Sequence, residues 1–186
     1  MIWVLVLVGI VVLLLILGVL FYNRLVRLRN RVDNAWAQIE VQLKRRWDLI
    51  PNLVETVKGY AEHERETFEA VTAARTRAQQ AQTPADTAQA EGILGQALGR
   101  LLAVAEAYPE LQADENFRQL QTELAETENR IAVSRQVYND AVLTYNNAIQ
   151  TFPGAVFAGP FGFSAREFFD VDDEAQREPP RVDFAR

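Results

Sequence analysis

The sequence has no cysteine and one histidine, and these two shortages limit the chemistry that the chain can perform. Without cysteine, disulfide bonds and thiolate metal sites are excluded, so the fold must depend on packing alone. The formal net charge of −6 at pH 7 argues against a nucleic-acid-binding domain, which is usually strongly basic. The 186 residues are enough for one ordinary domain with its own hydrophobic core.

Charged side chains are absent from residues 2–22, which form a long apolar run. At about 1.5 Å per residue this run gives a helix of roughly 30 Å, which matches one crossing of the hydrocarbon core. Trp3 and Tyr22 lie near its ends, where amphipathic rings favour the headgroup level. A cleaved signal peptide would need a basic start and a shorter apolar stretch of about 7 to 15 residues. The sequence therefore predicts a transmembrane anchor over residues 1–22.

Arginines are gathered on one side of this span. They are Arg24, Arg27, Arg29 and Arg31. The positive-inside rule then predicts an outside N-terminus and a cytoplasmic domain, with the anchor in the cell (inner) membrane. Arginines this close to a bilayer also attract anionic lipid, so the bilayer is the first expected partner.

Apolar residues recur at three- and four-residue steps from residue 22 to about residue 150, and no stretch alternates with the period of two typical of strands. The chain is therefore predicted to be all-α. We expect the first helix to continue from the membrane and to end near Arg46. Because residues before a proline avoid the α region, Pro51 is expected to break the chain and start a second helix, with Asp48 as a candidate cap.

Two further helices are predicted beyond the polar run that ends at Pro84. The third carries leucines at helical spacing and closes at residues 108–109. The fourth begins after Asp114, a candidate cap, and has apolar residues seven apart: Phe117, Leu124, Ile131, Tyr138 and Tyr145. Four amphipathic helices joined by short loops predict an antiparallel up-and-down four-helix bundle over residues 23–152.

Residues 153–186 lack helical periodicity and are predicted to be a non-helical C-terminal extension. Five phenylalanines crowd it: Phe157, Phe161, Phe163, Phe168 and Phe169. Exposed together they would favour aggregation, so either they dock on the bundle or a partner covers them. We expect partial docking that stops at the acidic residues 170–174, followed by a disordered end over residues 178–186.

Catalytic and metal-binding motifs are absent from the sequence. The segment HERET begins like the HExxH zinc helix, but Thr67 stands where the second histidine would be and His63 is the only histidine. Glycine-rich phosphate loops and the GxSxG elbow do not occur. The carboxylate runs are typical of solvated helix faces. We expect no catalytic residues, no cofactor and no metal.

One basic and aromatic cluster, Lys44, Arg45, Arg46 and Trp47, offers an alternative as a nucleic-acid contact. The simpler interpretation is a helix C-terminus whose dipole the cations compensate, with the tryptophan at the end of the bundle. We therefore expect no nucleic-acid partner.

Three segments carry a family resemblance: NAWAQIEVQLKRRWDLIPNL, AYPELQ and ENRIAVSRQVYNDA. Together they closely resemble the LemA family of bacterial membrane proteins. Trp47 departs from that pattern, where a smaller residue is expected. The resemblance implies a membrane-anchored helical bundle without a settled biochemical activity. It also implies relatives at bacterial organelle membranes and genes that neighbour a membrane metalloprotease.

The leading hypothesis is a non-enzymatic, single-pass membrane scaffold or adaptor that presents the bundle to proteins. Membrane organisation and protein quality control are the candidate roles; a membrane metalloprotease and further copies of the chain are the candidate partners. The alternative is an enzyme of unknown type. The residues proposed as polar links or partner contacts are Asp48, Asn52, Glu128, Asn129, Arg135, Asn139 and Asn146.

Overall fold

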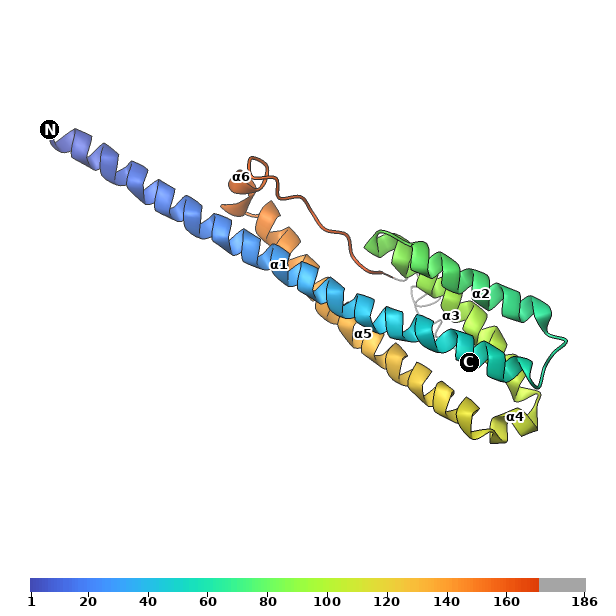
Figure 1. Ribbon diagram of the computed structural model, residues 1–186. Coiled ribbons are helices and arrows are strands. Elements are labelled where there is room, and N and C mark those ends of the chain that lie inside the picture. Colours follow the sequence, from blue (N-terminus) through green and yellow to red (C-terminus); the bar gives the residue numbers. More distant parts are fainter. Residues whose placement is uncertain (171–186) are drawn as a thin grey trace, which may run out of the picture. The chain divides into compact units, whose positions relative to one another are not determined.

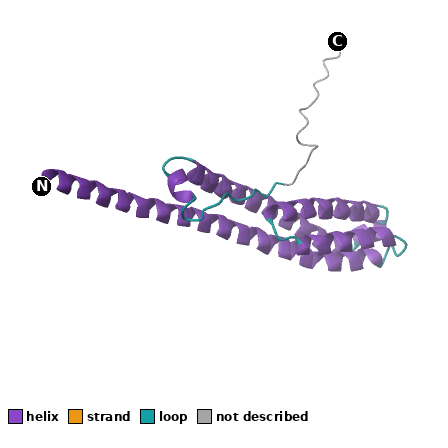
Figure 2. Cartoon of the chain, turned by 90° about the horizontal axis from the view of Figure 1, so that it is seen from above, coloured by secondary structure: helices purple, strands orange, loops and turns teal. Residues whose placement is uncertain are grey.

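The structure, a computed structural model, describes residues 1–170, and helices are the only regular elements in that part of the chain (Figures 1 and 2). The predicted all-α fold is confirmed. The helices are α1 (Ile2–Lys58), α2 (Arg65–Gln80), α3 (Pro84–Glu106), α4 (Pro109–Ala113), α5 (Glu115–Gln150) and α6 (Gly154–Ala158). Residues 171–186, with the expected disordered end, lie outside the described part.

Helix α1 joins the apolar run to the amphipathic part of the chain without a break. It holds the one span candidate among the described residues, with a mean hydropathy of 3.5 and none of that window buried. Burial begins at Leu25, just after the apolar run ends. The core helix of a soluble protein would bury such a run, so the exposure of this one fits a membrane segment.

The predicted break at Pro51 is wrong, because α1 continues through this proline to Lys58. A proline inside a helix has no N–H for the carbonyl four residues earlier, here that of Trp47. The Arg75 guanidinium on α2 replaces it, with Nε donating to the Trp47 carbonyl oxygen at 2.7 Å. The Trp47 indole N–H also donates to the Glu91 carboxylate on α3 at 2.6 Å. Three helices therefore meet around the position where the helix was expected to end.

The described residues fall into two compact units. The α1/α5 unit contains residues 1–46 and 123–168, which include most of α5 and all of α6. Its two long helices are antiparallel, since Trp36 contacts Tyr138 while Arg46, further along α1, pairs with the earlier Glu128. The seam between them buries Leu25, Val32, Ala35, Ile39, Leu43, Ile131, Tyr138, Ala141, Val142, Tyr145 and Ile149.

The α2/α3 unit contains the end of α1, helices α2 to α4 and the start of α5. Helices α2 and α3 are joined by residues 81–83 and pack side by side as an antiparallel pair (Figure 1). The Thr83 hydroxyl accepts the Asp86 N–H at 3.1 Å and caps α3. The predicted cap of the last long helix is confirmed, because the Asp114 carboxylate accepts the Phe117 N–H at 2.9 Å.

Candidate functional site: the C-terminal strap

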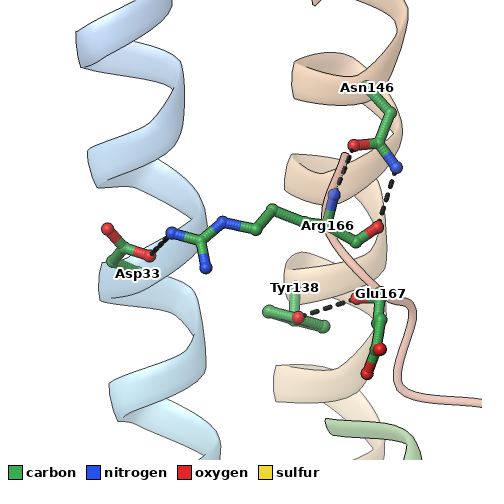
Figure 3. A network of polar contacts seen from close by, with 5 residues as sticks. All are labelled: Asp33, Tyr138, Asn146, Arg166 and Glu167. Carbon is green, nitrogen blue, oxygen red and sulfur yellow. Dashed lines mark hydrogen bonds and ion pairs between the residues drawn. The ribbon is translucent and has the colours of Figure 1, made fainter. Parts of the chain in front are cut away.

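After α6 the chain returns along the α1/α5 unit as residues 159–168, which we name the strap; its first four residues form turns, and the rest has no regular secondary structure. The Asn146 side chain on α5 holds it by two hydrogen bonds to the backbone of Arg166 (Figure 3). The amide nitrogen donates to the Arg166 carbonyl oxygen at 2.9 Å, and the amide oxygen accepts the Arg166 N–H at 2.9 Å. One buried side chain thus satisfies both backbone groups of Arg166, which itself lies in neither a helix nor a strand.

The strap also joins the two long helices of this unit. The Arg166 guanidinium reaches Asp33 on α1 at 2.9 Å, and the Tyr138 hydroxyl on α5 donates to the Glu167 carbonyl oxygen at 2.8 Å (Figure 3). Burial raises the pKa of Tyr138 to about 12, while nearby Arg166 acts in the opposite direction. Burial likewise raises the pKa of Tyr145. Both phenols are therefore neutral at physiological pH.

Aromatic rings continue these contacts towards the apolar run. Phe157 of α6 stacks on Phe21 with centroids 6.1 Å apart, and Tyr22 meets the strap residues Phe161 and Phe163 at 5.3 and 5.7 Å. The Arg29 guanidinium lies 5.4 Å from the centre of the Phe163 ring. The strap therefore follows α1 from the end of its apolar run towards Asp33.

A close approach between α5 and α6 fixes where this segment starts. A Cβ atom on Gly154 would collide with the Ala148 carbonyl oxygen, so only glycine fits here. Helix α6 is the one helical part of the otherwise non-helical extension up to residue 170. Of the five tail phenylalanines, Phe163 and Phe169 are buried and Phe157 is half-buried, whereas Phe161 and Phe168 are exposed. Docking of the aromatics is thus partial.

The seven residues proposed as polar links occupy different settings. Asn146 holds the strap, and Glu128 pairs with the buried Arg46 at 2.7 Å. Half-buried positions are held by Arg135 and Asn139, and exposed positions by Asp48, Asn52 and Asn129. Because α1 continues past residue 48, Asp48 does not begin a helix as expected. Their roles in partner binding stay predictions.

Among the proposed anchor residues, Trp3, Tyr22, Arg24, Arg27 and Arg31 are exposed, while Arg29 is half-buried against the strap. In the cluster considered for nucleic acid, Arg45 lies 4.0 Å from Glu123 and Arg46 pairs with Glu128. These two cations are therefore matched by carboxylates of α5. His63 is exposed, and no group of three or more metal-ligating side chains occurs within residues 1–170.

Sequence reasoning missed two members of the strap site, Asp33 and Arg166. They are 133 positions apart, and each looks like an ordinary surface charge. A signal was nevertheless present: Arg166 is the first charged residue after Asp140, at the end of a long uncharged stretch. A lone charge that ends such a stretch is a candidate for a specific ion pair.

The apolar, unburied start of α1, the antiparallel helices and the strap define a membrane-associated all-helical protein. The sequence profile of the LemA family matches residues 35–184. The chain belongs to the LemA family.

Magnetosome proteins and a LemA protein are similar in sequence to much of this chain. Magnetosome protein MamQ 1 and MamQ 2 of Paramagnetospirillum magneticum are each 31% identical in an alignment of 174 positions, which covers 80% of this chain and 64% of the relative. Protein LemA of Metamycoplasma hominis is 27% identical over 131 residues, 70% of this chain and 60% of the relative. The chain thus spans less than two thirds of these relatives. None of these names describes an enzymatic activity.

Proposed function

We propose that this protein is a non-enzymatic, single-pass membrane scaffold. It holds a helical domain in a defined orientation to the bilayer and presents this domain to protein partners. One observation carries the proposal: the apolar run and the buried seam belong to the same uninterrupted helix, α1. One continuous helix therefore carries both the membrane segment and the packing against α5.

A helix transmits orientation only where nothing bends it. Sharp kinks occur mostly at proline, at paired glycine and serine, or where the hydrogen-bond ladder is interrupted. Between Gly18 and Pro51 the chain has neither proline nor glycine. From Tyr22 to Arg46 the helical rise extends about 36 Å. A scaffold benefits from such a connection, because any surface on the α1/α5 unit keeps its distance from the membrane.

The four arginines after the span support a cytoplasmic domain, an outside N-terminus and a location in the inner membrane. The lack of native cysteine allows a clean test with single cysteines and a membrane-impermeant thiol reagent on intact cells. A cysteine inserted after Met1 should be labelled, while Gln136→Cys, at an exposed position on α5, should be labelled only after lysis. The reverse pattern would reverse the orientation.

Partner contacts are expected on the outer faces of the α1/α5 unit, where large apolar side chains are exposed. These exposed side chains are Val41 on α1 and Val133, Val137 and Leu143 on α5. The names of the MamQ relatives support a role in membrane organisation, with other membrane proteins or further copies of this chain as candidate partners. If the role is protein quality control, the candidate partner is a membrane metalloprotease.

Site-specific photo-crosslinking in intact cells tests the scaffold function. A photoreactive amino acid at exposed Val41 should give discrete adducts with other proteins. The matched control is buried Ile39 on the same helix, which should react only within the chain. Equal intermolecular yields at residues 39 and 41, or adducts from none of the four exposed positions, would contradict the proposal. Adducts between identical chains would identify self-assembly as the interaction.

A further inference from the structure

We infer that α6 and its flanking turns form a second membrane contact, a wedge of residues 152–161 that enters the lipid headgroup region beside the span. The inference rests on the proposed anchoring of α1. The partner of the wedge is the lipid of the same bilayer that α1 crosses. The inference follows from where α6 lies along α1, from the missing charge and from the side chains that α6 leaves uncovered.

The position of α6 is set by contacts with the last turn of the apolar run. Phe157 stacks on Phe21, and a Cβ atom on Gly18 would lie 3.5 Å from the Phe157 ring. The first charged residue of α1, Arg24, follows within two turns. If residues 2–22 cross the hydrocarbon core, the contacts of α6 place it at the level where the core gives way to headgroups. In Figure 1 the α6 ribbon lies beside α1, near the end of α5.

The composition of this segment suits a headgroup region. From residue 141 to residue 165 the chain carries no aspartate, glutamate, lysine, arginine or histidine. The first part of this stretch, up to Gln150, is the end of α5, and residues 151–165 contain α6 and its flanking turns. Charge returns only at Arg166, which is held at Asp33, further from the apolar run. A surface segment such as residues 151–165 would usually carry charge in water, whereas a segment that touches lipid avoids the cost of desolvating it.

Large apolar side chains of the wedge are exposed. Phe152 is 85% exposed and Val156 is 60% exposed, and Phe161 is still 55% exposed although one part of its ring contacts Tyr22. They flank Phe157, which stacks on Phe21, so this short segment contacts α1 on one side and leaves apolar surface that nothing in residues 1–170 covers on the other. Aromatic and aliphatic side chains at a bilayer surface gain free energy by burial among headgroups and upper acyl chains.

One basic side chain, Arg24, lies beside this face. Arg24 lines a small hollow of about 50 Å³ together with Phe21, Phe152 and Pro153. An exposed guanidinium at this level can pair with lipid phosphate while the neighbouring phenylalanine enters the apolar boundary. Two contacts, the span and the wedge, would fix the rotation of the α1/α5 unit about α1 as well as its depth. A single span leaves that rotation free.

Fluorescence of single-cysteine variants tests the wedge in the full-length protein, reconstituted into vesicles of phosphatidylcholine and phosphatidylglycerol. An environment-sensitive dye is attached at Phe152→Cys, Val156→Cys or Phe161→Cys, and at Gln136→Cys on α5 as the exposed control. Quenching by brominated lipid should be roughly threefold or more stronger at the wedge than at residue 136, because interfacial groups lie about 5–10 Å into the boundary. Equal quenching at all four positions, with full access to aqueous iodide, would overturn the inference.

A dye at Leu14→Cys separates this inference from the anchoring on which it rests. Strong lipid quenching at residue 14 with none at the wedge would refute the wedge alone, and no quenching at residue 14 would refute the anchor. A second copy could also cover the wedge. In that case the signal would vanish when protein is diluted to one chain per vesicle, which would overturn the inference. A dye at Val156→Cys should return to a water-like signal when Phe152→Asp and Phe161→Asp are added.

Discussion

The two units build their cores from different side chains and from different numbers of helices. In the α2/α3 unit, α3 buries a face rich in small residues, which includes Ala88, Ala90, Ala97 and Ala105 beside Leu94 and Leu101. Helices with small residues can approach closely, and here further helical segments complete the core. The α1/α5 unit has only two long helices, with tyrosine and branched aliphatic side chains in the seam.

This difference explains why the strap exists. Two helices cover one stripe of each other and leave the flanks of that stripe open. In the α1/α5 unit the strap covers one flank with Phe163, and side chains hold its residues 166 and 167 because these lie in neither a helix nor a turn. The α2/α3 unit should therefore depend on packed volume, whereas the α1/α5 unit should depend also on a few polar contacts.

The largest effect is expected from loss of volume in the α2/α3 unit. Leu101→Ala removes a fully buried side chain and should lower the free energy of unfolding by about 2–5 kcal/mol. Ile93→Ala on the exposed side of the same helix is the control and should cost less than about 0.5 kcal/mol. Chemical denaturation in detergent micelles measures both. Equal losses would mean that the face of α3 assigned to the core is wrong.

Asn146→Ala should release the strap from α5. Two backbone groups of Arg166 lose their partner, so we expect a cost of about 1–3 kcal/mol. Because trypsin cleaves after arginine, the rate of cleavage at Arg166 reports release directly. The matched control is Asn147→Ala at the exposed neighbouring position, which should cleave at the wild-type rate. Unchanged cleavage in Asn146→Ala would show that other contacts suffice to hold the strap.

The Tyr138 contact predicts a loss of stability in alkali. Its folded pKa of about 12 lies above the ordinary value of 10.0, so the folded state keeps the phenol proton longer than the unfolded state. The stability that this gives is complete below pH 10 and is lost as the pH rises towards 12. Tyr138→Phe should cost about 0.5–1.5 kcal/mol at neutral pH, through the lost bond to Glu167.

The same variant should also flatten the alkaline decline. Some slope should remain, because burial raises the pKa of Tyr145 as well. Ultraviolet titration of tyrosinate, together with denaturation at several pH values, checks both effects. A wild-type protein whose stability is constant up to pH 12 would contradict the assignment.

The smallest effect is expected at the ion pair between Asp33 and Arg166. Both side chains are about half exposed, so solvent screens the interaction and Asp33→Asn should cost only about 0.2–1 kcal/mol. A double-mutant cycle with Arg166→Gln isolates the pair energy, and it should shrink in high salt. A coupling above about 2 kcal/mol would mean that the strap shields this pair more than its exposure suggests.

The seven-residue spacing predicted the long last helix, and four of its five marker residues are buried in α5. Leu124 is half-buried, so the seam is less regular than the spacing. The cap at Asp114 and the reversal before Pro84 were also predictable, because they depend on neighbours in the chain. The contacts of Asn146 and Asp33 with Arg166 were not predictable, since they join positions with no local relation.

The sequence by itself determined the apolar run, the all-α class and the bounds of α3 and α5, because hydrophobic periodicity and capping are local properties. Only the tertiary structure decided two features. Helix α1 passes Pro51 because Arg75, from another helix, donates to the carbonyl that the proline leaves without a partner. The strap lies on α1 and α5 because Asn146 and Tyr138 satisfy its backbone. Both depend on hydrogen-bond partners that are distant in sequence, and local propensities do not encode those partners.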